Sequence, residues 1–252
     1  MFSAKDIEAT MLDMADDAQR QTLQRFFKTG KGQYGEGDKF LGIKVPQTRS
    51  VVREARRQVP DGEIEILLHS PWHEVRLCGF LLIVEEMKVA TPARREPPTA
   101  RAARRQQLLD LYLRNAQMAN NWDLVDLSCP YIVGAYLLLP DEGGQMPGRD
   151  LLDSLAKSDN LWEQRIAIVS TLALIRKGQT SDTLRIADLL ITHPHDLIHK
   201  AIGWALREVG KSDIDTLRAY LDTHALRLPR TSLRYAIERM DPDERKMWMT
   251  RK

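Results

Sequence analysis

The sequence has 252 residues, 43% of them hydrophobic and 29% charged, so it can bury a core and has the composition of a soluble globular protein. No apolar run approaches the roughly 18 residues of a membrane span, and the first residues lack a signal-peptide core, so we expect a cytoplasmic protein without membrane partners. A net charge of only +2, from 37 basic and 35 acidic residues, means that bulk charge does not indicate nucleic-acid binding.

The N-terminal part predicts two helices followed by a glycine-rich loop. Ile7, Met11 and Met14 recur at helical spacing, and a second helix is expected to end near Phe26-Phe27-Lys28. The next segment contains a formal G-x-G-x-x-G from Gly30 to Gly35. A dinucleotide site needs a strand before this motif, whereas a helix is expected here. We therefore predict a flexible loop, with phosphate binding by its amides and neighbouring lysines as the alternative.

From Pro46 onwards the sequence indicates a series of helices. Pro46 begins a helix that runs to about Arg57, and Pro60-Asp61-Gly62 ends that segment. Five further helices are expected to begin near residues 71, 121, 161, 196 and 229. A polar residue lies near each of these starts, namely Arg76, Asp126, Arg165, Lys200 and Arg234. Successive positions in this series are 50, 39, 35 and 34 residues apart by subtraction. The last three intervals are typical of HEAT-like helix pairs.

Two insertions interrupt this pattern. Thr91–Arg105 is rich in proline, arginine and alanine, which predicts a loop and the start of a basic helix and explains the long first interval. Asp141–Gly148 contains glycine and proline and predicts a second loop.

The predicted fold class is all-α, because strand signals are nearly absent and no Asn-Gly or Asp-Gly pair joins two alternating runs. We expect residues 1–252 to form a single domain, a right-handed α-solenoid of HEAT-like repeats. The concave face of such a stack is usually the binding face, and here we expect it to be a basic cleft.

The first candidate site lies in Asn120–Asp126. Asn120 or Asn121 can cap a helix start, and Asp123 then suits the positive end of the helix dipole. Trp122 and Asp126 are four residues apart and share one face, while Leu124, Val125 and Leu127 supply the apolar face. Pro130 predicts that the helix kinks or restarts just beyond Asp126. A core tryptophan and a surface aspartate are the alternative interpretation.

The second candidate lies in the helix expected over residues 197–209. Its apolar line does not include Trp204, and it consists of Ile198, Ala201, Ile202, Ala205 and Val209. Trp204 shares a face with Lys200 and Arg207. An aromatic ring beside cations suits a sugar-phosphate chain, although a protein-binding hot spot has the same composition.

Further cations lie on neighbouring helices. Arg227, Arg230 and Arg234 form a basic stripe in the last repeat. Arg165 lies in an apolar stretch, so its guanidinium is expected to reach the helix edge or to bind an anion. A solvated or ion-paired arginine is the alternative.

A metal site has little support in this sequence. His193-Pro194-His195 and His199 have metal-ligand spacing, but no cysteine or further histidine lies nearby to complete a tetrahedral set, and Pro194 more simply starts a helix. Cys78 and Cys129, each in an apolar helical segment, are predicted to be reduced and buried. No catalytic triad, P-loop or paired catalytic carboxylates appear in their expected context.

Three motifs in this order resemble the AlkD-type bacterial DNA alkylation-repair glycosylases. They are Asn121–Asp126, Leu161–Arg165 and His199–Glu208, and the similarity runs over most of the chain, including Lys28–Pro46 and Pro229–Glu238. The glycine-rich loop and the Thr91–Arg105 insertion have no counterpart that we can assign in that family.

The resemblance implies an all-helical protein of HEAT-like repeats. It assigns Trp122, Asp126, Arg165 and Trp204 to the DNA-binding cleft, with Lys200, Arg207, Arg230 and Arg234 as our candidates for further DNA contacts. It also implies release of cationic N3- and N7-alkylated purines from duplex DNA, without a metal or cofactor and without extrusion of the base. A monomer that acts on the bacterial nucleoid is the corresponding expectation.

A helical-repeat scaffold that binds DNA or a protein without chemistry is the rival hypothesis, because repeat folds commonly serve as scaffolds. Asp126 discriminates between the two, since pure DNA binding does not require a carboxylate.

Overall fold

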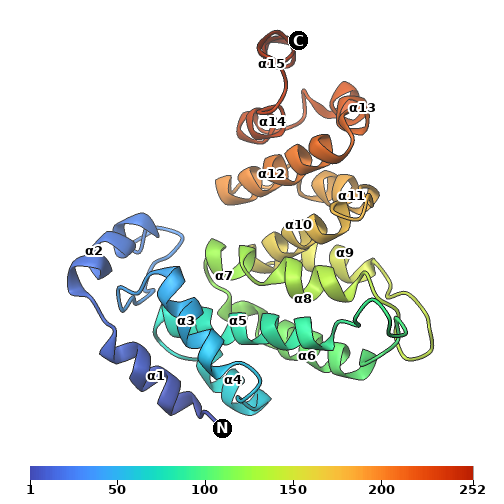
Figure 1. Cartoon of the computed structure of the whole chain (residues 1–252). Helices are drawn as coiled ribbons and strands as arrows, with labels where there is room; N and C mark the ends of the chain where they lie inside the picture. Colours follow the sequence, from blue (N-terminus) through green and yellow to red (C-terminus); the bar gives the residue numbers. More distant parts are fainter. Residues whose placement is uncertain (252) are drawn as a thin grey trace. The chain divides into compact units, whose positions relative to one another are not determined.

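The computed structural model describes residues 1–251, and these form fifteen α-helices and one short 3₁₀ helix (Figure 1). The described residues contain no β-strand, only an isolated bridge between Lys39 and Trp72. The all-α prediction is therefore confirmed. No helix among these residues is long and apolar enough to cross a membrane.

The chain divides into two compact units. Unit 1 comprises Met1–Ile132 and Leu139–Gln145, and unit 2 comprises Val133–Leu138 and the chain from Met146 onwards. The boundary falls inside α8 (Cys129–Tyr136). The single-domain expectation stays a prediction.

In unit 1, α5 (His73–Ala90) is the central helix, buried over most of its length and in contact with α1, α3, α4, α6 and α7. The helices of unit 1 that precede α8, other than α5, are α1 (Ala4–Asp13), α2 (Asp17–Phe26), α3 (Val45–Ala55), α4 (Asp61–Leu68), α6 (Ala102–Arg114), η1 (Ala116–Met118) and α7 (Trp122–Asp126). The predicted starts near residues 71 and 121 are confirmed by α5 and α7.

One helix of unit 1 is missing from the sequence prediction. Pro60 does not simply end a segment but caps α4, which buries Ile64, Leu67 and Leu68. Asp61 and Glu63 in the first turn of α4 are the usual acidic signal of a helix start, because they face the positive end of the helix dipole.

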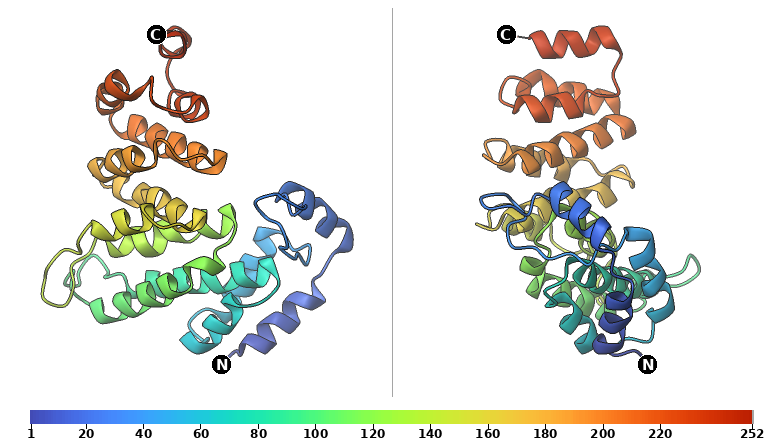
Figure 2. Two further views of the ribbon diagram at one scale, coloured as in Figure 1. Left: turned by 180° about the vertical axis from the view of Figure 1, so that it is seen from behind. Right: turned by 90° about the vertical axis from the view of Figure 1, so that its left-hand side faces the viewer.

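Unit 2 is a stack of helix pairs in two layers. One layer contains α10 (Leu161–Ile175), α12 (Asp196–Ser212) and α14 (Arg230–Ala236), and the other contains α9 (Asp150–Ala156), α11 (Ser181–Leu190) and α13 (Ile214–His224). α15 (Pro242–Thr250) follows α14, and Figure 2 shows these orange and red helices one above another. The predicted helix starts near residues 161, 196 and 229 and the predicted helical pairs are confirmed.

Close contact between α12 and α14 depends on a glycine. A Cβ atom at Gly203 would lie 2.5 Å from the Cβ of Tyr235 and 2.6 Å from the carbonyl oxygen of Ser232. The Ser232 hydroxyl donates to the carbonyl of His199 at 2.8 Å and joins the two helices. α12, which carries Trp204, is therefore held closely against α14.

Both predicted insertions are irregular. Residues 92–101 contain no helix before α6 begins at Ala102, and residues 141–148 contain no helix before α9. Cys78 and Cys129 are buried and unbonded to each other, which confirms the sequence prediction.

Candidate functional site

The start of α7 forms as its sequence predicts. Asn121 is the N-cap, and its side-chain oxygen accepts the Trp122 N–H at 2.9 Å. Leu124 and Val125 are fully buried, while Trp122 and Asp126 are only half-buried. α7 ends at Asp126, and α8 restarts at Cys129 beside Pro130, as expected.

Trp122 and Asp126 line the same cavity, which has a volume of about 420 Å³. Its other walls come from the end of α2, the segment after the glycine-rich loop and the start of α5. The lining includes Leu23, Phe26, Phe27, Phe40, Ile43, Lys44, Val45, Pro46, His73, Glu74, Asp123 and Leu127. We call this space the aromatic cavity. All of its lining residues belong to unit 1.

Aromatic rings form a continuous cluster along the cavity wall. Trp122 stacks on Phe27 with ring centroids 5.3 Å apart, and Phe26 meets Trp122 edge-on at 5.9 Å. Phe27 in turn stacks on Phe40 at 5.1 Å, and Phe40 stacks on His73 at 4.3 Å. Trp122 is thus supported by two phenylalanines without being a fully buried core residue, and its contact with a ligand stays a prediction.

A buried network of charges lies directly behind this cluster. His73 donates through Nδ1 to Asp38 at 2.7 Å and through Nε2 to Asp123 at 3.0 Å. Arg76 donates to the other Asp38 oxygen at 2.6 Å and to the side-chain oxygen of Asn120 at 3.0 Å. His73, Asp38, Asp123 and Arg76 are all buried. The network ties α5 to the glycine-rich loop and to the first turn of α7.

His73 is charged at neutral pH. Burial of its ring opposes protonation, but attraction and hydrogen bonds from Asp123 and Asp38 outweigh burial and raise the pKa of His73 to about 9. Burial likewise opposes ionisation of Asp38, but His73 and Arg76 bring the pKa of Asp38 below its usual value. Sequence reasoning missed His73 and Asp38, and it assigned Asp123 to the helix dipole alone. A histidine and an acidic residue opening an otherwise apolar helix were the available signal.

Glu74 fixes the opposite wall of the cavity. Its carboxylate accepts the backbone N–H groups of Leu41, Gly42 and Ile43 at 2.9, 2.9 and 3.1 Å. Gly42 has φ +92°, and a Cβ atom there would lie 2.0 Å from the carbonyl oxygen of Asp16. Only glycine therefore lets this segment pass α2 closely enough to form the wall.

The glycine-rich segment is an irregular loop with α2 before it, as predicted. The Gly35 N–H donates to the Lys28 carbonyl at 3.2 Å, and a Cβ atom at Gly35 would lie 2.5 Å from the Phe27 carbonyl oxygen. The loop ends at Asp38, so the charged network holds it at that end. Phosphate binding by this loop stays a prediction.

In unit 2, Trp204 is half-buried and the predicted apolar line of α12 is buried, namely Ile198, Ala201, Ile202, Ala205 and Val209. The two cations beside Trp204 are engaged in ion pairs. Lys200 pairs with Asp196 at 2.7 Å, and Arg207 pairs with Glu238 on the last turn of the neighbouring repeat. Phosphate binding at these cations requires exchange of a carboxylate for a phosphate oxygen.

Arg165 is buried and donates through Nη1 to the Leu197 carbonyl at 2.6 Å. Its guanidinium thus reaches the first turn of α12, in line with the expectation that it leaves its apolar stretch. Arg230 donates to the Met249 carbonyl at 2.6 Å, and Arg234 is exposed.

The histidines of the predicted metal alternative serve other purposes. His195 caps α12 by accepting the Leu197 N–H at 3.1 Å, and His193 pairs with Gln164 at 2.8 Å. His199 pairs with the His193 carbonyl at 2.5 Å. Within the described residues no group of three or more histidine, cysteine, aspartate or glutamate side chains could hold a metal ion.

A family model described as DNA alkylation repair enzyme matches residues 7–240. Among solved structures, a predicted DNA alkylation repair enzyme from Enterococcus faecalis has the same fold, with a TM-score of 0.65 and 16% sequence identity over 90% of this chain and 97% of that chain. No curated protein matches the chain. With its family model spanning nearly the whole sequence, the chain belongs to the DNA alkylation repair enzyme family.

Proposed function

We propose that this protein is a DNA glycosylase that hydrolyses the N-glycosidic bond of cationic N3- or N7-alkylated purines in duplex DNA. The observation that carries the proposal is the position of Asp126 beside Trp122 on the wall of a largely apolar aromatic cavity. A carboxylate in such surroundings stabilises a nearby positive charge more strongly than it would in water.

The chemistry needs little more than this carboxylate. An alkylated purine already carries a positive charge, so it leaves with the bonding electron pair as a neutral base when the bond to C1′ breaks. The positive charge then resides on the deoxyribose, where Asp126 stabilises it electrostatically and orients the attacking water. Water adds to C1′ and its proton passes to Asp126 or to solvent, which leaves an abasic sugar. A leaving group that is already charged requires no metal ion for its activation.

The indole of Trp122 provides an apolar surface for the deoxyribose, and its stacking on Phe27 fixes the ring before DNA arrives. In unit 2, Trp204 offers a second such surface, and Lys200, Arg207, Arg230 and Arg234 are proposed to contact the DNA backbone. Arg165 completes the proposed DNA-contacting set. The same proposal includes a monomer that acts on bacterial nucleoid DNA without extruding the base.

Release of free base from methylated DNA tests the proposal. Duplex DNA treated with a methylating agent is incubated with wild-type protein or with Asp126→Asn, and free methylated purines are quantified by chromatography. We expect wild type to release 7-methylguanine and 3-methyladenine well above the spontaneous rate and the variant to release far less. Wild-type protein that binds the duplex but releases no base above background would favour the non-catalytic scaffold.

A further inference from the structure

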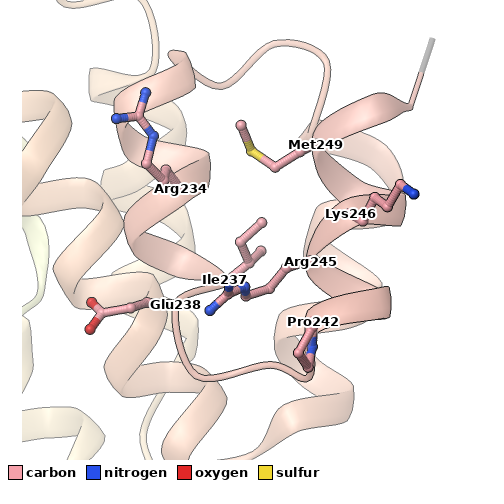
Figure 3. A pocket seen from close by; sticks show the side chains of 7 residues that line it. All are labelled: Arg234, Ile237, Glu238, Pro242, Arg245, Lys246 and Met249. Atoms are coloured by element: carbon pink, nitrogen blue, oxygen red, sulfur yellow. The ribbon is translucent and has the colours of Figure 1, made fainter.

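Unit 2 contains a second hollow, between α14 and α15, with a volume of about 400 Å³. It is lined by Arg234, Ile237, Glu238, Pro242, Arg245, Lys246 and Met249, and Figure 3 shows these side chains on α14, on the turn that follows it and on α15. We call it the α14–α15 hollow. From it we infer that α15 extends the DNA-binding surface, with Arg245 and Lys246 binding backbone phosphates several base pairs away from the damaged nucleotide. This inference rests on the proposed function.

The charges of the hollow are unbalanced in favour of an anion. Arg234, Arg245 and Lys246 are exposed, and within residues 1–251 none of them has an ion-pair partner. The one carboxylate of the lining, Glu238, is already paired with Arg207 of α12. Three cations around one hollow therefore lack a counter-charge among residues 1–251, and a polyanion supplies it.

The apolar part of the lining fits the rest of a DNA backbone. Ile237 forms a buried floor, and Pro242 and Met249 flank it. In Figure 3 the Arg245 side chain extends from α15 towards α14 and passes beside Ile237. A guanidinium above an apolar surface matches a phosphate joined to a deoxyribose, since arginine binds two phosphate oxygens and the sugar ring packs on aliphatic carbons.

The hollow continues the surface that carries Trp204. Arg207 is three residues beyond Trp204 on α12, and its partner Glu238 belongs to the hollow. α14 packs against α12, and α15 follows α14. The axes of packed helices lie about 10 Å apart, so two steps, from α12 to α14 and from α14 to α15, span about 20 Å. This distance corresponds to about six base pairs at 3.4 Å each.

A charge-matched pair of double variants tests this inference. The hollow variant is Arg245→Gln with Lys246→Gln. The control variant is Lys157→Gln with Lys177→Gln, which removes the same charge at two exposed lysines of unit 2 outside the hollow. The probe is an uncleavable duplex in which one nucleoside is replaced by a positively charged azasugar, and binding is measured by fluorescence anisotropy from low to moderate salt. Thermal unfolding at the wild-type temperature verifies the fold of both variants.

The hollow variant should bind about 10-fold or more weakly near 0.1 M salt, and its log–log salt slope should be less negative by about 2, since each lost phosphate contact contributes about 0.9. The control variant should bind like wild type. Equal weakening of both variants would show an effect of net charge alone and would overturn the inference, as would wild-type binding by the hollow variant.

Duplex length gives a second readout. A duplex with about ten base pairs on each side of the azasugar should show the difference between wild type and the hollow variant, whereas truncation to about three base pairs on one of the two sides should abolish it. If the difference survives truncation of the left side and also, in a separate duplex, truncation of the right side, the proposed distance is overturned. Neither readout requires base release, so a protein that shows both but releases no base would refute the proposed glycosylase and leave the hollow as a DNA contact. If the protein releases base but the hollow variant binds DNA like wild type, only the inference about the α14–α15 hollow is refuted.

Discussion

The charge on His73 makes the stability of unit 1 depend on pH in a defined direction. The pKa of His73 is raised from 6.5 to about 9 in the folded protein, by Asp123 and Asp38 against the opposing effect of burial. Each pKa unit corresponds to about 1.4 kcal/mol, so protonation of His73 stabilises the fold by about 3 kcal/mol. Because the folded pKa is higher than the unfolded one, this stabilisation is fully present below pH 6.5 and is lost as the pH rises through 9.

Equilibrium unfolding in urea between pH 6.5 and 9.5 measures this loss. We expect the free energy of unfolding of the wild-type protein to fall by about 3 kcal/mol over this range. His73→Gln keeps a polar side chain of similar size but cannot carry the charge, so it should be less stable than wild type at pH 6.5 and nearly independent of pH over the same range. Groups that do not contact His73 contribute equally to both proteins, so the difference between the two curves isolates His73 together with its partners Asp38 and Asp123. Parallel curves for wild type and variant would refute the reasoning.

Three further predictions concern the DNA-binding residues. Asp126→Asn should leave affinity for an uncleavable duplex equal or slightly higher, since a carboxylate repels the polyanion, but should lower single-turnover base release by about 10²-fold or more, roughly 3 kcal/mol. The effect should be larger for stable N7-alkylated lesions than for labile N3-alkyladenine, and a variant with the wild-type rate would remove Asp126 from the mechanism. Trp204→Ala should weaken both binding and base release and keep a cooperative thermal transition, because the buried line of α12 does not include Trp204; loss of that transition would identify a core residue. Binding of wild type to duplex DNA should fall with salt at a log–log slope of roughly −4 to −5 if about four to six phosphates are neutralised, whereas a salt-insensitive affinity would favour a protein partner.

Local features of this fold could be read from the sequence because they depend on neighbouring residues. The cap by Asn121 and the restart of the helix beside Pro130 follow from side chains within a few positions of each other. The position of Trp204 outside the apolar line of α12 likewise follows from helical spacing. The ion pair of Lys200 with Asp196 at i−4 had the same kind of signal and could have been predicted from it.

Contacts between distant segments could not be read in this way. The network around His73 joins residue 38 in a loop, residue 73 on α5 and residue 123 on α7, and no local pattern specifies which acids meet which base. The pairing of Arg207 with Glu238 depends on how α12 packs against α14. The aromatic cavity was missed for the same reason, since Phe26, Phe40 and Trp122 come from three segments.

The three hydrogen bonds accepted by Glu74 have a consequence for the kinetics of recognition. Because the amides of residues 41–43 are held by a buried carboxylate of α5, this wall of the aromatic cavity is ordered in the protein alone. A segment that is already ordered loses no conformational entropy when a ligand arrives, so we expect the proposed substrate to meet this wall without a preceding ordering step. Slow hydrogen–deuterium exchange at these amides in the free protein would be the visible sign of this preorganisation.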